Sequence, residues 1–210
     1  MSFSSPFHDA AQSPPLVQLP PDSFFRLFVK LNQLDQIAHF LFLPGMLFHD
    51  TLQWWGSRPR LHPHEGMDIY LMQDREARAI TVLPQMLIPA MLSGELVHFH
   101  RDFLGETIYI RHPEMRQKNA VLHTLYGHIS PAGSVLGVQT STGLTCPSFI
   151  NKGQIVGTIS PPPETSSVPA HLHISCAWID ADQQLQELSW EKMSVGSNIV
   201  FIDPLPFLLQ

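Results

Sequence analysis

The segment Ala170-His171-Leu172-His173-Ile174-Ser175 alternates side chains with the period of a β-strand. In a strand, side chains two positions apart project to the same face. His171 and His173 are therefore predicted to lie together on one face, with Leu172 on the other. Two imidazoles presented side by side by a rigid strand are a common way to begin a metal site.

An earlier segment, His64-Glu65-Gly66-Met67-Asp68, has the same parity. Extended backbone would place His64, Gly66 and Asp68 on one face. If this segment and the later histidine pair form neighbouring strands, imidazoles and a carboxylate converge beside a residue that has no side chain. A His/His/Asp set that leaves one position for water is the composition of a catalytic zinc site rather than a structural one.

The chain after Gly66 contains short apolar runs, most of them separated by turn residues. The runs are Met67–Leu71, Ala79–Leu87, Glu95–His100, Thr107–Arg111, Ala120–Tyr126, Gln154–Ile159 and His171–Ile179. Many are rich in Ile, Val, Thr and Tyr, the pattern of strands in an all-β domain. Pro84 and Pro89 favour an edge strand or a kink nearby. The sequence thus predicts a mainly β, antiparallel fold of the sandwich or barrel-like type.

The N-terminal part of the chain has a different pattern of residues. Residues 1–21 are rich in Ser and Pro and are predicted to form an irregular arm. Apolar residues then recur at helical spacing, and Asp22 or Ser23 could cap a helix that Pro44-Gly45 ends. The apolar positions are Phe24, Leu27, Phe28, Leu31, Leu34, Ala38 and Leu41. We therefore predict an arm and helix over residues 1–50 and one catalytic-type domain over residues 51–210.

The bulk composition excludes some functions. The 210 residues contain 12 Lys and Arg against 18 Asp and Glu, a net charge of −6 without a basic run, so nucleic acid is not an expected partner. No membrane-spanning segment and no N-terminal signal peptide are predicted. The 12 histidines raise the expectation of a metal. The two cysteines, Cys146 and Cys176, leave both pairing and redox compartment open.

Other histidines were weighed as ligands. The chain has two further His-x-His pairs, at His62 with His64 and at His98 with His100. An alternative built on His98, His100 and Glu106 is a cupin-like metal oxygenase, but the Glu spacing is long, and these two histidines are interpreted as ordinary strand residues. His62 is interpreted as a non-ligand.

Four segments carry a family resemblance, and they occur in a fixed order. They are His64-Glu65-Gly66-Met67-Asp68, Leu125-Tyr126-Gly127-His128-Ile129-Ser130, Lys152-Gly153-Gln154-Ile155-Val156-Gly157 and His171-Leu172-His173. Together they resemble the signatures of lysostaphin-type (LytM-like) zinc endopeptidases over residues 58–205. The resemblance implies an antiparallel β fold with a shallow groove.

The resemblance also implies roles for five residues. His64, Asp68 and His173 would bind Zn²⁺, with water in the fourth position, and His171 and His128 would flank that water. Zinc lowers the pKa of bound water, so a neutral imidazole can take its proton, and a second imidazole can stabilise the developing negative charge. We assign His171 as the general base and His128 as the transition-state stabiliser, with an exchange of these two roles left open.

The family cuts peptide bonds in bacterial peptidoglycan, in stem peptides or glycine-containing cross-bridges. The resemblance therefore implies such peptides as substrates, and the cell envelope as the location if the family role holds. The segments 130–150 and 161–170 depart from the family pattern and are expected to border the groove, so substrate preference is expected to be unusual. The alternative is a non-catalytic LytM-like regulator or scaffold that binds a partner or the cell wall. Oligomeric state stays open.

Overall fold

The computed structural model describes residues 19–56, 58–134, 139–140, 143–144, 148–185, 188–193 and 198–210. The predicted arm before residue 19 lies outside the described residues. So does Cys146, and its pairing with the buried Cys176 therefore stays open. Among the described helices, none has the length and hydropathy needed to cross a membrane.

Helix α1 (Phe24–Leu31) begins where the sequence predicts, with the Ser23 hydroxyl accepting a hydrogen bond from the Arg26 N–H at 3.5 Å. It ends much earlier than predicted. The side-chain amide of Asn32 donates to carbonyls of α1 and of a distant strand, and residues 37–41 form strand β1 (Ile37–Leu41). The prediction of a helix continuing to residue 43 was wrong, because pairing of β1 with β3 (Leu71–Asp74) overrides the helical spacing.

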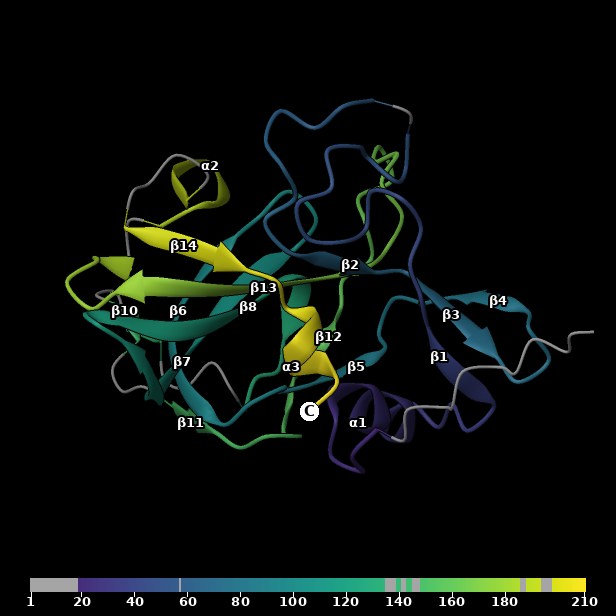
Figure 1. Ribbon diagram of the computed structural model, residues 1–210, viewed down its shortest axis with the longest axis horizontal. Helices are drawn as coiled ribbons and strands as arrows, with labels where there is room; N and C mark the ends of the chain where they lie inside the picture. Colours follow the sequence, from purple (N-terminus) through teal and green to yellow (C-terminus); the bar gives the residue numbers. More distant parts are fainter. Residues whose placement is uncertain are drawn as a thin grey trace, which may run out of the picture.

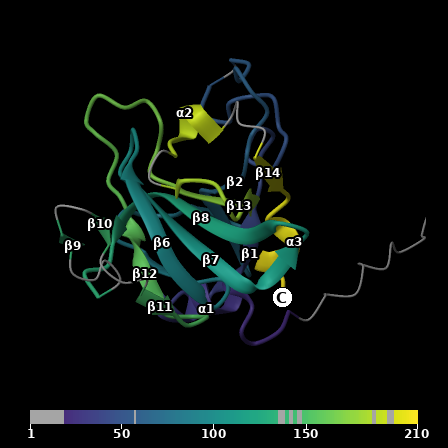
Figure 2. The same ribbon diagram turned by 90° about the vertical axis from the view of Figure 1, so that its left-hand side faces the viewer.

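The main sheet is antiparallel throughout, and its central path runs β11-β6-β7-β8-β12-β5. Its strands are β5 (Leu87–Pro89), β6 (Gly94–Arg101), β7 (Glu106–Gln117), β8 (Ala120–Pro131), β11 (Ser148–Ile150) and β12 (Ile155–Ile159). Figure 2 shows β6, β7 and β8 as long neighbouring strands. Over the described residues the path is open at β11 and β5, so the sheet does not close into a barrel. The predicted mainly antiparallel β fold with an N-terminal helix is confirmed.

Strand β13 (Leu172–Asp180) extends this sheet, because it pairs with β8 and also with β2 (Met67–Ile69) and β14 (Ile199–Ile202). Figure 1 shows β2 and β14 following one another along the same side of β13. The remaining elements are β4 (Ala79–Thr81), β9 (Gln139–Thr140), β10 (Gly143–Leu144), α2 (Trp190–Met193) and α3 (Leu205–Leu208). The two segments that the sequence predicted to be neighbours, around residues 64–68 and 170–175, are therefore side by side.

Strand β8 changes partner at His128. It pairs with β13 as far as Gly127 and with β12 from Ile129 onwards. Along the other edge of β8, the register with β7 shifts at the same place, which is characteristic of a β-bulge. His128 has a φ of +62°, a left-handed conformation that costs about 1–3 kcal/mol in a non-glycine residue. The bulge re-aims the His128 side chain relative to a regular strand.

The hydrophobic core joins α1 to the sheet. Phe24 and Phe28 of α1 are fully buried in the same cluster as Met67 of β2 and Ile129 of β8. Helix α1 thus supports the strands that carry the predicted site. The domain boundary predicted at residue 50 stays a prediction.

Candidate active site

Three predicted ligands meet where β2 pairs with β13. Asp68 lies directly opposite His173 in the register of the two strands, and His64 lies just before β2. All three are buried, with at most 5% of their surface exposed. Asp68 Oδ1 lies 2.8 Å from His173 Nδ1 and 3.3 Å from His64 Nε2, and these two nitrogens are 3.3 Å apart. Among the described residues this is the one cluster of three such side chains able to hold a metal ion.

Hydrogen bonds fix the proton of one imidazole and leave that of the other to its surroundings. His64 Nδ1 lies 3.1 Å from the Leu47 carbonyl, which can only accept, so Nδ1 carries the proton and Nε2 presents a lone pair. His173 Nε2 lies 2.8 Å from the Ser175 hydroxyl, which can donate or accept, so His173 can carry its proton on Nε2 or share it with Asp68 through Nδ1. A cation would select the Nε2–H form, in which His64 Nε2, His173 Nδ1 and Asp68 Oδ1 all present lone pairs to one point.

The donor set fits zinc. Two neutral imidazoles and one carboxylate are zinc ligands, and tetrahedral ligands about 2.0–2.1 Å from the ion lie about 3.3 Å apart. Two of the three separations are 3.3 Å and the third, between Asp68 and His173, is 2.8 Å. The cluster is therefore close to the spacing that zinc requires.

Gly66 allows β2 to approach β13 at this point. A Cβ atom added there would lie 2.4 Å from the Ile174 carbonyl oxygen, 2.5 Å from Ser175 Oγ and 2.7 Å from His173 Nε2. Backbone cannot move out of the way cheaply, so only glycine is accommodated beside the His173 imidazole. This is the physical reason for the glycine between the first two candidate ligands.

The second oxygen of Asp68 is held by two residues that the sequence interpretation missed. Trp54 Nε1–H donates to Asp68 Oδ2 at 2.7 Å, and the Arg60 guanidinium donates to it at 3.3 Å. Burial alone would raise the pKa of Asp68, but the neighbouring imidazoles outweigh it and hold the pKa well below its usual range. Asp68 is thus an ionised carboxylate with Oδ2 fixed and Oδ1 presented to the histidines. Hydrogen-bond partners of this kind orient metal ligands.

His171 lies beside this cluster, immediately before β13 begins. Its Nδ1–H donates to the Pro169 carbonyl at 2.8 Å, and its Nε2 lies 3.5 Å from Asp68 Oδ1. The edge of the ring meets Trp54, with ring centres 5.2 Å apart. Burial lowers the pKa of His171 to about 4. A neutral imidazole therefore presents its Nε2 lone pair to the site.

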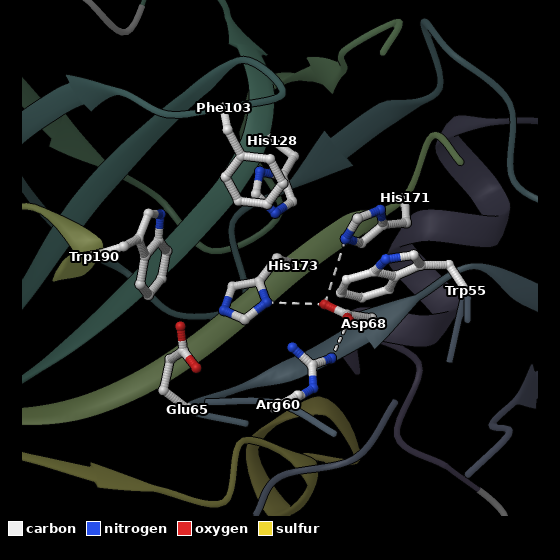
Figure 3. A pocket seen from close by; sticks show the side chains of 9 residues that line it. All are labelled: Trp55, Arg60, Glu65, Asp68, Phe103, His128, His171, His173 and Trp190. Carbon is white, nitrogen blue, oxygen red and sulfur yellow. Dashed lines mark hydrogen bonds and ion pairs between the residues drawn. The ribbon is translucent and has the colours of Figure 1, made fainter. Parts of the chain in front are cut away.

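His128 completes the histidine group from strand β8. Its ring centre lies 4.8 Å from that of His171 and 5.8 Å from that of His173, and its ring points into the pocket (Figure 3). Phe103 packs edge-on against its outer side at 4.7 Å. On the other side its Nδ1 lies 3.1 Å from the buried carboxylate of Asp102. The structure brings all five predicted site residues together.

The pocket above these groups is narrow, with a volume of about 90 Å³. Aromatic rings of Trp55, Phe103 and Trp190 stand around it, as Figure 3 shows. The Trp190 ring meets His173 edge-on at 4.9 Å. Glu65 and Arg60 add charged groups to the lining. The site is thus a small aromatic-walled pocket with the histidines at its base.

The other candidate histidines lie elsewhere. His62 is exposed, as expected of a non-ligand. His98 and His100 of β6 stack on each other and pack at a tilt against Tyr109 of β7. Over the described residues they form no metal-binding group with Glu106. The cupin-like alternative therefore lacks the cluster that it requires. Tyr126 is fully buried, and its hydroxyl accepts the Met91 N–H at 2.7 Å, so it is a structural residue.

No family model and no curated protein matches the sequence. Several solved structures are similar in fold. CbpA from L. salivarius REN is 15% identical over 80% of this chain and 87% of that one, with a TM-score of 0.46. The catalytic domain of the prophage-encoded M23 protein EnpA from Enterococcus faecalis is 20% identical over 72% and 93%, with a TM-score of 0.36.

Lysostaphin is 17% identical over 85% of this chain, with a TM-score of 0.44, and this chain spans about half of its length, 52%. The solved structures that are similar to this chain thus include one of the lysostaphin type that the sequence motifs resemble. Because the identities are low, the arguments that follow depend on the geometry of the site itself.

Proposed function

We propose that the protein is a zinc-dependent metalloendopeptidase that hydrolyses peptide bonds in bacterial peptidoglycan peptides. The observation that carries the proposal is the convergence of three buried atoms of metal-ligand type, His64 Nε2, Asp68 Oδ1 and His173 Nδ1, 2.8–3.3 Å apart. The remaining polar atoms of these side chains are already committed to hydrogen bonds. A cation is the partner that this arrangement would hold.

Zinc held by these ligands would supply Lewis acidity and a bound water of lowered pKa. His171 would act as the general base. Its Nδ1–H is committed to the Pro169 carbonyl, so Nε2 is the atom that can take a proton as water attacks the peptide carbonyl.

His128 would stabilise the negative charge that develops on the carbonyl oxygen. In its doubly protonated form it keeps Nδ1–H on Asp102 and has Nε2–H free to donate. The ring is fixed between Phe103 and the Asp102 carboxylate, so the donor is in place before substrate arrives.

The pocket favours a slender substrate. A space of about 90 Å³ between Trp55, Phe103 and Trp190 suits a peptide with small side chains better than one with bulky side chains. Glycine-containing peptides are therefore the first substrates to test, followed by stem peptides from peptidoglycan.

The test separates metal binding from turnover. We expect His173→Ala to lose both zinc and activity, and His171→Ala to keep zinc but lose turnover. Elemental analysis on protein purified without a chelator or a metal-binding tag reads the first property, and cleavage of peptidoglycan fragments and glycine-containing peptides reads the second. His62→Ala is the matched control, because His62 lies two positions before a proposed ligand yet is exposed.

Full activity in both variants would refute the proposal. Absence of zinc from the wild-type protein, even after reconstitution, would also refute it and would favour the non-catalytic regulator or scaffold. In that case the pocket would be a binding site only.

A further inference from the structure

The turn between β6 and β7 carries a carboxylate that the sequence interpretation did not single out. The Asp102 side chain has no exposed surface. Its Oδ1 accepts hydrogen bonds from the N–H groups of Leu104 at 2.9 Å and Gly105 at 2.8 Å, and its Oδ2 accepts one from the Thr107 hydroxyl at 2.7 Å. His128 supplies two further contacts, its backbone N–H to Oδ2 at 2.9 Å and its Nδ1 to Oδ1 at 3.1 Å.

These contacts determine the proton on His128 Nδ1. Burial opposes ionisation of Asp102, but the hydrogen bonds and charge of His128 outweigh burial and hold the pKa of this carboxyl below its usual range. An ionised carboxylate can only accept, so Nδ1 must carry a hydrogen whether the ring is neutral or protonated. His128 Nε2 is then the ring nitrogen that is not engaged by Asp102.

Asp102 also holds the backbone of His128. At the β-bulge the His128 residue is left-handed, and its N–H donates to Asp102 Oδ2 instead of to a neighbouring strand. The side-chain and main-chain hydrogen bonds run from one residue to the two oxygens of one carboxylate. This two-point contact fixes both the position of the ring and its rotation.

We propose that Asp102 is a positioning residue that locks His128 as the Nδ1–H form and directs Nε2 into the pocket. The inference rests on the proposed function, in which His128 Nε2 acts on the reacting peptide. It adds a residue that lies 26 positions before His128 and whose hydrogen bonds reach the side chain and the backbone of His128.

The same carboxylate supports a second wall of the site. The Trp190 indole N–H donates to Thr107 Oγ1 at 3.1 Å, and the Thr107 hydroxyl in turn donates to Asp102. Trp190 packs edge-on against His173. Asp102 therefore links Trp190 on one side of the pocket, through the Thr107 hydroxyl, with His128 on the other side. Each hydrogen bond in this chain joins a donor to an acceptor.

The first test reads the tautomer of His128 directly, by ¹⁵N NMR of the imidazole nitrogens in the intact zinc-loaded protein. His128→Ala identifies the signals by their loss. We expect the wild-type Nδ1 to be protonated and Asp102→Asn to shift the ring toward the Nε2–H form. Thr107→Val is the matched control and should keep the wild-type tautomer, because it removes one donor to Oδ2 and leaves the Nδ1 contact.

A wild-type ring in the Nε2–H form, or an Asp102→Asn spectrum with the tautomer unchanged, would overturn the proposal. The wild-type measurement decides the question even if the variant does not fold. It also does not depend on catalysis, so it separates failure of this inference from failure of the proposed function.

The second test is kinetic. Loss of correct acid–base positioning costs about 100-fold or more, so Asp102→Asn should lower kcat by that order while zinc content and KM stay near wild type. In the double variant with His128→Ala, activity should be no lower than in His128→Ala alone, because Asp102 acts through His128. Losses that multiply in the double variant would overturn the proposal and show a general structural role.

Discussion

Trp54→Phe removes one hydrogen bond from the candidate metal centre and little else. The indole N–H is the shorter of two donors to Asp68 Oδ2, at 2.7 Å against 3.3 Å for Arg60. A phenyl ring retains an aromatic surface where the indole stacks on Tyr70 at 4.7 Å and meets His171 at 5.2 Å. The substitution therefore tests the orientation of the carboxylate rather than the packing around it.

The expected loss of zinc affinity can be calculated from the hydrogen bond between Trp54 and Asp68. A hydrogen bond to a charged group contributes about 1.5–3 kcal/mol, and partners of metal ligands commonly account for about 10–100-fold in affinity. Since about 1.4 kcal/mol is a factor of ten, both figures point to about 2 kcal/mol, or about a 30-fold weaker zinc Kd. Arg60 keeps part of the orientation, so complete loss of zinc is not expected.

Competition with a chromophoric zinc chelator near neutral pH measures the change. Trp178→Phe is the matched control, since Trp178 lies on β13 but pairs with Val200 of β14, away from the ligands. A zinc Kd in Trp54→Phe equal to that of wild type would refute the reasoning. Equal weakening in both variants would also refute it, because the effect would then come from the loss of any tryptophan near the sheet.

Three other perturbations test the surrounding structure. Gly66→Ala should abolish zinc binding and lower Tm, because the added Cβ would lie 2.5 Å from Ser175 Oγ; wild-type zinc content would contradict this. Tyr126→Phe leaves the buried Met91 N–H without its acceptor and should lower the free energy of unfolding in urea by about 1–3 kcal/mol, whereas an unchanged midpoint would contradict it. Burial lowers the pKa of His123 from 6.5 to about 4, so the unfolded chain binds a proton that the folded state rejects. The contribution of neutral His123 to the free energy of unfolding should therefore be fully present above pH 6.5 and fall by about 3 kcal/mol as the pH is lowered towards 4. His123→Phe should reduce this fall in urea titrations. An identical pH dependence of the two proteins would contradict the prediction.

The ligand geometry could be predicted from local parity. Alternation along an extended chain places His171 with His173, and His64 with Asp68, whatever the rest of the fold. Only the pairing of the two segments had to be assumed. The structure shows this pairing, with Asp68 opposite His173 in the register. The predicted strands were recognisable for a different reason, since most of the runs are short, rich in Ile, Val, Thr and Tyr, and separated by turn residues.

The supporting residues could not be found in this way. Trp54 and Arg60 come from an irregular segment whose path no periodicity describes, so their contact with Asp68 is visible only in three dimensions. Asp102 offered a partial signal, because an Asp three positions before Gly105 is typical of a turn. Its partner His128 is brought to it by the bulge in β8, and a register shift of that kind leaves no mark in the pattern of apolar residues.

The helix that continued too far in the prediction has a similar cause. Leu34, Ala38 and Leu41 keep helical spacing, but Asn32 binds the Leu87 carbonyl and the chain turns at Gln33 with a φ of +55°. Tertiary contacts therefore decided the end of α1. Spacing alone cannot represent a competition between a local helix and a distant strand.

The pairing of β2 with β13 couples the ion site to global unfolding. His64 and His173 are 109 positions apart in the chain, and they meet only when these two strands are paired. An ion held by both would act as a reversible cross-link that closes a long loop, and its binding free energy would add to the stability of the whole sheet. Zinc should then raise the temperature of the entire cooperative transition, and chelation should lower it, rather than ordering or loosening a single surface loop.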